Sequence, residues 1–254
     1  MGTQARTKSR EVRQAAAELA RKRATQRRRL LAGGGVIIAG LLIAIVVSLV
    51  NAAGSANPSD DPPPTGTVVA PANTTPAGAI MIGTTTAPVK LEIFLDYMCP
   101  YCGRFERANG GELERLVNDG TVRLEMYPLA FLDRQSAGTK YSSRAANAVA
   151  TVADRAPDKV LAFSTALFAK QPEEGGPGLT DTEIAKLATD AGVPAGVVDS
   201  FHEQRFAPWI ATSTDAAFKT GITGTPTVRI NGKDFKGDLY TVGPLTNAIK
   251  AAQG

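Results

Sequence analysis

The pattern of apolar and polar positions predicts a strand–helix–strand unit in the middle of the chain. Residues 87–95 form a mostly apolar run, and residues 121–127 alternate between apolar and polar side chains, so each predicts a β-strand. Between them, residues 102–118 place apolar side chains on one face at helical spacing, with a kink expected at the Asn-Gly-Gly of residues 109–111. This order predicts an α/β domain.

A long stretch of helical pattern follows, from about residue 136 to residue 220. Proline and glycine clusters divide it into pieces expected at 137–155, 158–170, 180–191, 194–206 and 207–220. Thr180 and Glu183 have the spacing of a capping box, so the third of these helices is expected to start at Thr180.

Strand character returns near the C-terminus. Residues 227–230 predict a strand, the Asn-Gly pair that follows predicts a hairpin turn, and residues 233–236 predict the partner strand. Residues 244–252 predict a closing helix. Residues 80–254 are therefore expected to form one domain, of a normal size for a single hydrophobic core.

The N-terminal part of the chain has the pattern of a membrane anchor. Residues 30–50 carry no charge and are mostly apolar, and they follow a basic segment, residues 1–29. A helix of that length spans about 30 Å, the thickness of the hydrocarbon core of a bilayer. Because basic flanks stay in the cytoplasm, we expect a single-pass signal-anchor in the cell membrane, with the N-terminus inside and the rest of the chain outside. A cleaved signal peptide is the alternative, since Ala52 and Ala53 follow the span.

Composition explains the segment after the span and the charge of the chain. Residues 51–79 contain six prolines and few large apolar residues, so we expect a disordered, partly polyproline linker. The formal net charge is +4, but the basic head has ten Lys or Arg against two Glu, so the rest of the chain is net negative. With no basic cluster interleaved with aromatic residues outside the head, we expect no nucleic-acid binding.

Cys99 and Cys102 are the only cysteines, and they enclose Pro100 and Tyr101 in a Cys-x-x-Cys motif. The motif lies between the first predicted strand and the following helix. Two thiols at this spacing can close a disulfide within one turn, and a helix N-terminus favours the thiolate. The motif therefore predicts redox chemistry that transfers two electrons.

The order of elements, the Cys-x-x-Cys motif and Thr225-Pro226 before a late strand together resemble the thioredoxin fold. The helical block at about 136–220 resembles the inserted helical domain of DsbA-like thiol:disulfide oxidoreductases. The resemblance covers residues 88–252. It implies an α/β thioredoxin fold with a helical insertion, here preceded by a transmembrane helix and a linker.

The resemblance also implies roles for individual residues. Pro226 would be cis, and the backbone at Thr225 would pair with a bound substrate chain. From its place at the helix N-terminus, Cys99 is expected to be exposed, and it would be attacked by a substrate thiolate. Cys102 lies one turn into the helix and is expected to be buried. Tyr101 would tune access to the pair and the stability of the thiolate. No cofactor is expected. The partners would be exported proteins with thiols and a membrane redox protein that recycles the pair.

Several positions depart from the pattern of the strongest oxidants. Tyr101 stands where those proteins carry His, and the only histidine, His202, is expected on a distant helix surface. The acid that many relatives carry six residues before the first cysteine is Ile93 here. Asp96 is a candidate for tuning the pair, and Glu92 is expected to be a solvated strand carboxylate.

These features predict a membrane-anchored, extracytoplasmic thiol–disulfide oxidoreductase, foremost an oxidase. The alternative is an isomerase or reductase of the same fold, because the Pro-Tyr dipeptide and the threonine before Pro226 also resemble proteins of the DsbG type. A metal chaperone and a non-catalytic binding module are further hypotheses. Two thiolates with no other soft ligand make a poor Zn or Cu site, so no metal is expected.

Overall fold

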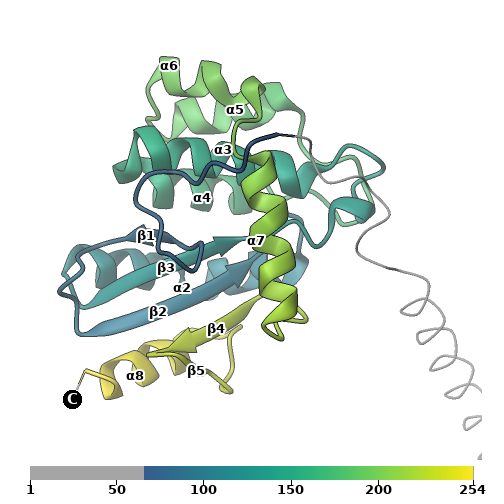
Figure 1. The fold of residues 1–254 in the computed structure, drawn as a ribbon. Helices are drawn as coiled ribbons and strands as arrows, with labels where there is room; N and C mark the ends of the chain where they lie inside the picture. The colour runs from purple at the N-terminus through teal and green to yellow at the C-terminus, as the bar shows by residue number, and fades with distance from the viewer. Residues whose placement is uncertain (1–65, 254) are drawn as a thin grey trace, which may run out of the picture. The chain divides into compact units, whose positions relative to one another are not determined.

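A computed structural model describes residues 66–253 of the chain. Its five strands form one sheet with the order β1-β3-β2-β4-β5 (Figure 1). The strands are β1 (Ile80–Ile82), β2 (Val89–Leu95), β3 (Val122–Pro128), β4 (Thr227–Ile230) and β5 (Lys233–Asp234). β2 pairs in parallel with β3 and antiparallel with β4, so it is the central strand of the sheet.

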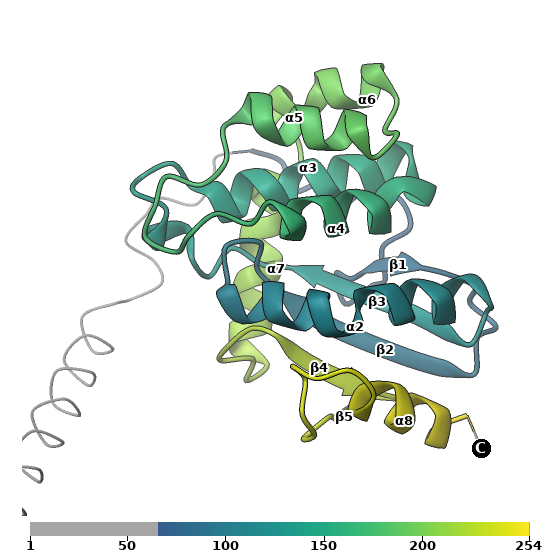
Figure 2. The same ribbon diagram turned by 180° about the vertical axis from the view of Figure 1, so that it is seen from behind.

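The helices cover both faces of the sheet and one of its edges. α2 and α8 lie on one face and α7 lies on the other, whereas α3 to α6 gather beyond the β1 edge (Figures 1 and 2). The helices are α2 (Pro100–Asn118), α3 (Tyr141–Arg155), α4 (Val160–Ala169), α5 (Asp181–Asp190), α6 (Ala195–Val198), α7 (Ala207–Lys219) and α8 (Pro244–Ala251), with 3-10 turns at Asp133–Gln135, Pro157–Lys159 and Asp199–Glu203. The fold is thus the predicted α/β arrangement with a helical insertion.

Most predicted elements are present, with shifted ends. The capping box at Thr180 is formed, and the Asn-Gly turn has positive φ at both residues, 49° and 80°. α2 begins at Pro100, two residues earlier than expected, and continues through residues 109–111 as one helix. The predicted helix at 194–206 is instead a four-residue helix followed by a 3-10 turn. The three-residue strand β1 was not predicted, because so short an edge strand leaves no periodicity to detect.

Glu92 is not the solvated carboxylate that strand alternation predicted. It keeps only 8% of its surface exposed, and it lies opposite Glu125 of β3. Lys90 Nζ lies 3.1 Å from a carboxylate oxygen of Glu92, and Arg123 Nη2 lies 3.1 Å from one of Glu125. The central position of β2 explains the burial, and the two cations offset the repulsion between adjacent carboxylates.

Residues 66–79, which composition assigned to the linker, pack against the folded domain. Pro71 is buried, and the N–H of Ala72 donates to Asp154 Oδ1 on α3 at 2.8 Å. Composition reports that a segment cannot build its own core, but it does not report docking onto a core built elsewhere. This part of the linker prediction is therefore wrong.

The remaining N-terminal predictions concern the basic head at 1–29, the transmembrane helix at 30–50 and the linker up to residue 65. These segments lie outside the described residues. Within residues 66–253, no helix combines the length and apolar character needed to cross a bilayer.

Candidate active site

The Cys-x-x-Cys motif lies at the start of α2, just beyond the end of the central strand. Cys99 is the N-cap residue, with extended φ and ψ of −68° and 116°, and Pro100 opens the helix. The carbonyl oxygen of Cys99 accepts hydrogen bonds from the N–H groups of Cys102 at 2.9 Å and Gly103 at 3.2 Å. The first cysteine therefore lies at the positive end of the helix dipole, where proline costs no hydrogen bond.

Folding brings the second predicted motif next to the first. The Thr225-Pro226 peptide bond is cis, as the resemblance implied. In the thiol form, Cys99 Sγ donates to the carbonyl oxygen of Thr225 at 3.2 Å. The two motifs are far apart in sequence, and the antiparallel pairing of β4 with β2 places them side by side.

Cys102 is buried as expected, with 1% of its surface exposed. Cys99 was expected to be exposed, but it keeps only 6%. The expectation was wrong because an N-cap position alone does not reveal neighbours from other elements. Here the backbone at Thr225 covers one side of the residue, and Gln171 contacts its main chain.

The environment separates the acidities of the two thiols. The pKa of Cys99 is lowered to about 6, first by the hydrogen bond from the Cys102 thiol and then, against the effect of burial, by the Thr225 side chain and the N–H groups of Cys102 and Tyr101. Burial and the neighbouring Cys99 raise the pKa of Cys102 well above its usual value. Cys99 can therefore be a thiolate near neutral pH while Cys102 keeps its proton.

Asp96, the tuning candidate, is fully buried three residues before the first cysteine. Its Oδ1 accepts from the N–H of Met98 at 2.8 Å and the hydroxyl of Ser142 at 2.6 Å, and its Oδ2 accepts from the N–H of Leu132 at 2.9 Å. Burial raises the pKa of Asp96 to about 7, although these three bonds oppose the rise. The carboxyl group thus joins the motif loop to α3 and to the segment that follows β3.

Tyr101 is exposed, as is Pro100, and it keeps 53% of its surface accessible. The Arg104 guanidinium lies 5.7 Å from the centre of the Tyr101 ring and 4.6 Å from that of Tyr240. The two ring centres are 5.8 Å apart. This Tyr–Arg–Tyr cluster gives the motif an aromatic, cationic flank.

The structure adds two residues that the sequence did not single out. Gln171, in the segment after α4, donates from Nε2 to the carbonyls of Cys99 at 2.8 Å and Tyr97 at 3.1 Å. Glu106 on α2 accepts a hydrogen bond from Thr165 of α4 at 2.6 Å. An isolated glutamine before a proline and a glutamate between arginines resemble surface residues, so no sequence signal marks either.

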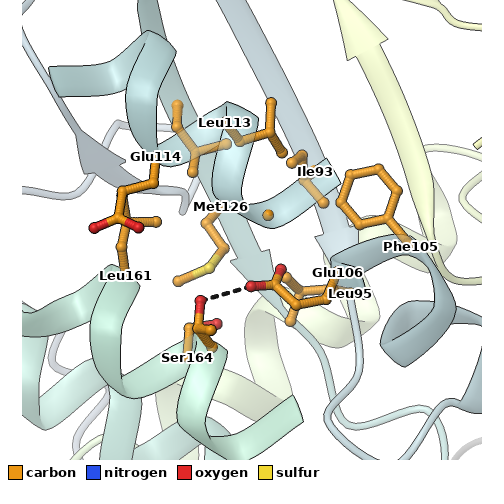
Figure 3. Close-up of a pocket in the computed structure, with 12 residues that line it drawn as sticks. Ile93, Leu95, Phe105, Glu106, Leu113, Glu114, Met126, Leu161 and Ser164 are labelled. Carbon is orange, nitrogen blue, oxygen red and sulfur yellow. Dashed lines mark hydrogen bonds between the residues drawn. The ribbon is translucent and has the colours of Figure 1, made fainter. Parts of the chain in front are cut away.

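Glu106 borders a small cavity of about 30 Å³ between α2, the sheet and α4 (Figure 3). Burial raises the pKa of its carboxyl group. Ile93, at the position where many relatives carry an acid, lines the same cavity from β2. The cavity thus has an acid at its edge, but the acid comes from α2 and not from the strand.

His202 is exposed in the 3-10 turn before α7, as predicted, and is not part of the site. Within residues 66–253, no three His, Cys, Asp or Glu side chains gather as a potential metal-ligand group.

Comparison with known proteins agrees with this geometry. The thioredoxin family profile matches residues 75–251, which is more than half of the chain. The chain belongs to the thioredoxin family. Among solved structures, this thioredoxin-family chain is similar to the reduced disulfide bond oxidoreductase DsbG of Mycobacterium tuberculosis, with 30% identity and a TM-score of 0.62, covering 71% of this chain and 90% of that one. It is similar to oxidised DsbA of the same organism at 31% identity and a TM-score of 0.60, covering 69% and 93%.

Two kinds of curated relative match parts of the chain. Disulfide bond formation protein D of Bacillus subtilis is 28% identical over 162 residues, which are 63% of this chain and 70% of the relative. The serine/threonine-protein kinase PknE of Mycobacterium tuberculosis is 36% identical over 117 residues, but the match spans only 21% of the kinase. The likeness to DsbG and DsbA, at 30% and 31% identity over 90% and 93% of those chains, places the chain among the DsbA-like thiol–disulfide oxidoreductases.

The first prediction concerns the acidity of Cys99. We expect the alkylation rate of the reduced full-length chain by iodoacetamide to rise with a midpoint near pH 6, at about the pKa of the Cys99 thiol. At pH 7 about nine tenths of Cys99 would be thiolate, against about three hundredths for an unshifted thiol. Cys102→Ala should raise the midpoint, because the thiol that bonds to Cys99 is removed.

The same shift fixes the sign of a stability effect. Because the pKa of Cys99 is lower in the folded state, its contribution to the unfolding free energy of the reduced chain is complete above about pH 9 and is lost as pH falls through about 6. An alkylation midpoint at pH 8 or above, equal to that of the chain in urea, would contradict this reading of the site.

The second prediction concerns Asp96. Asp96→Ala leaves the Met98 and Leu132 N–H groups and the Ser142 hydroxyl buried without a partner, at roughly 1–3 kcal/mol each. Urea unfolding should therefore show a loss of about 3–9 kcal/mol. The raised pKa makes the neutral carboxyl the favoured form, so its contribution fades as pH rises through about 7 and the loss should be larger at pH 5 than at pH 8.

Asp158→Ala, at an exposed acid, is the matched control and should change stability by less than about 0.5 kcal/mol. An equal loss of unfolding free energy in the two variants would mean that the hydrogen bonds of the buried Asp96 carboxyl do not stabilise the fold.

Proposed function

We propose that this chain exchanges disulfides with the thiols of exported proteins through Cys99 and Cys102, foremost as an oxidase. The observation that carries the proposal is the contrast between the two thiols. Cys99 is acidic and contacts the carbonyl of Thr225, while Cys102 is buried and holds its proton. In a pair arranged in this way, the first sulfur can be attacked by a substrate and can leave as a thiolate, whereas the second is shielded from solvent.

The reaction starts from the Cys99–Cys102 disulfide. A substrate thiolate attacks the Cys99 sulfur, the bond to Cys102 breaks, and Cys102 leaves as a thiolate that takes up a proton. A second substrate thiolate then attacks the substrate sulfur of the mixed disulfide, and Cys99 leaves as a thiolate. The substrate loses two electrons and the enzyme pair gains them. The low pKa of Cys99 favours this last departure.

The other motif residues support these steps. Thr225 and Pro226 form the loop beside the reacting sulfur, where an extended substrate chain would pair with the Thr225 backbone. Pro100 fixes the backbone at the helix start, and exposed Tyr101 meets the incoming substrate. Asp96 tunes the pair indirectly, by holding the loop that carries Cys99.

An isomerase or reductase of the same fold is the second candidate. The similarity to DsbG of Mycobacterium tuberculosis and the Pro-Tyr dipeptide favour it. The direction of electron flow separates the candidates, and the reduction potential measures that direction.

Membrane attachment completes the proposal. Residues 30–50 would anchor the chain, the basic head at 1–29 would stay in the cytoplasm, and residues 51–65 would lead to the catalytic domain on the outer side, against which residues 66–79 pack. With no second cysteine pair in the chain, an external membrane redox partner would reoxidise Cys99 and Cys102.

The third prediction tests the roles of the two cysteines. Cys99→Ser should abolish exchange with a dithiol peptide, because the attacked sulfur is gone. In Cys102→Ser, the Cys99 thiolate can still attack the disulfide of an oxidised peptide, and one peptide cysteine leaves as a thiolate. Cys102 is then missing and cannot resolve the mixed disulfide, so trapped complexes should accumulate on non-reducing gels. If Cys102→Ser abolishes exchange without trapping and Cys99→Ser traps complexes, the proposed roles are reversed.

The fourth prediction tests the direction of electron flow. We expect the full-length chain, equilibrated with glutathione buffers, to have a potential between about −120 mV, as in DsbA, and about −270 mV, as in thioredoxin. Tyr101→His should raise it, since a partly protonated imidazole stabilises the thiolate of the reduced form. A potential at or below that of thioredoxin would refute the oxidase and favour the reductase.

The fifth prediction tests topology. A reporter that is active only outside the cytoplasm, fused after residue 254, should be active, and deletion of residues 30–50 should abolish that activity. An inactive but fully expressed fusion of the complete chain would rule out the outer location of the catalytic domain.

A further inference from the structure

Gln171 links the helical insertion to the main chain of the redox motif. Its Nε2 donates to two carbonyls at once, those of Cys99 at 2.8 Å and Tyr97 at 3.1 Å. The Cys99 carbonyl also accepts hydrogen bonds from the N–H groups of Cys102 and Gly103, which close the first turn of α2. One amide from another part of the fold therefore holds the backbone on both sides of Met98, directly before the reacting sulfur.

The amide also changes the charge around the thiol. A helix N-terminus favours the Cys99 thiolate through its partial positive charge. Carbonyl oxygens at the same place carry partial negative charge and oppose that effect. The Gln171 amide places its donor end against the Cys99 and Tyr97 oxygens and offsets them, without adding a full charge that would alter the pair.

Gly103, the residue after the motif, makes room for this contact. A Cβ added at Gly103 would lie 2.1 Å from Gln171 Oε1 and 2.9 Å from its Cδ. Such an approach is impossible without displacing the glutamine side chain. Gly103 has ordinary helical φ, so the space it leaves for Gln171, and not its backbone conformation, accounts for a glycine inside the helix.

The segment that carries Gln171 is itself held in place. The N–H of Gly175 donates to the carbonyl of Gln135 at 2.8 Å, and Arg144 donates to the carbonyl of Leu179 at 2.8 Å. The Gln171 N–H also bonds to the end of α4. The amide is thus presented to the motif from a fixed point of the insertion.

We propose that Gln171 is a positioning residue for Cys99. Its amide holds the start of α2 in the geometry that makes the Cys99 sulfur reactive, and Gly103 leaves the space that this amide occupies. The role rests on the proposed function only in taking Cys99 as the reacting thiol. Gln171 does not touch the substrate. It acts through the two carbonyls.

The experiment measures the alkylation of Cys99 by iodoacetamide from pH 5 to pH 9 in the reduced full-length chain. Gln171→Ala removes both hydrogen bonds and should move the midpoint upward and lower the rate at pH 6 by about two-fold or more. Gln171→Glu keeps the shape but cannot donate when ionised and adds a negative charge, so its shift should be larger. Because that charge alone would move the midpoint, Gln171→Met separates the two roles, since Met keeps the volume but cannot donate. A role in filling space alone would leave Gln171→Met silent, whereas loss of the two hydrogen bonds should shift its midpoint as in Gln171→Ala.

Gly103→Ala tests the same contact from the other side. Alanine improves the intrinsic helix propensity of α2, so a purely structural effect would be stabilising. We expect the midpoint to rise nevertheless, because the new methyl group displaces Gln171. In the Gln171→Ala background Gly103→Ala should have no further effect, which is the non-additivity of residues in contact.

Glu173→Ala, at an exposed residue of the same segment, is the control and should leave the profile unchanged. The proposal is overturned if Gln171→Ala leaves the midpoint in place, or if Gly103→Ala and Gln171→Ala shift it additively. Alkylation reads the thiolate without a protein substrate. Failure of the exchange assays would therefore count against the proposed function and leave this test intact.

Discussion

The redox motif depends on a carboxyl group that has no contact with water. Asp96 lies where the central strand ends, and its two oxygens take up donors from the motif loop, from α3 and from the segment after β3. Three structural elements, namely the motif loop, the segment after β3 and α3, thereby share one acceptor group. A buried acid is costly unless its oxygens are satisfied, and this requirement makes the junction specific to one arrangement.

The surroundings of the pair come from three different sources. The helix start supplies N–H groups, the segment before β4 supplies the Thr225 carbonyl, and the insertion supplies Gln171. The thioredoxin core alone would provide the first two. The insertion is therefore part of the redox centre and not only a lid beside it, since its amide contacts the main chain of the reacting cysteine.

The sequence predicted those parts of the fold that produce local signals. Alternation, helical spacing, the capping box at Thr180 and the Asn-Gly turn each depend on neighbouring residues, so they could be recognised. The cis bond at Pro226 came only from the resemblance. The burial of Cys99 and Glu92, the docking of residues 66–79 and the role of Gln171 depend on contacts across long sequence separations, and no local pattern encodes them.

The contact between Gly103 and Gln171 has a consequence for the evolution of the fold. The two positions share one volume, so a side chain gained at one must be matched by a loss at the other. Among related chains with the same loop length, a glycine at the position of Gly103 should occur together with a glutamine or another long amide at the position of Gln171. A chain with alanine or a larger residue at the position of Gly103 should carry a shorter side chain at the position of Gln171. The residue after the motif would then record whether the helical insertion holds the redox helix through its backbone.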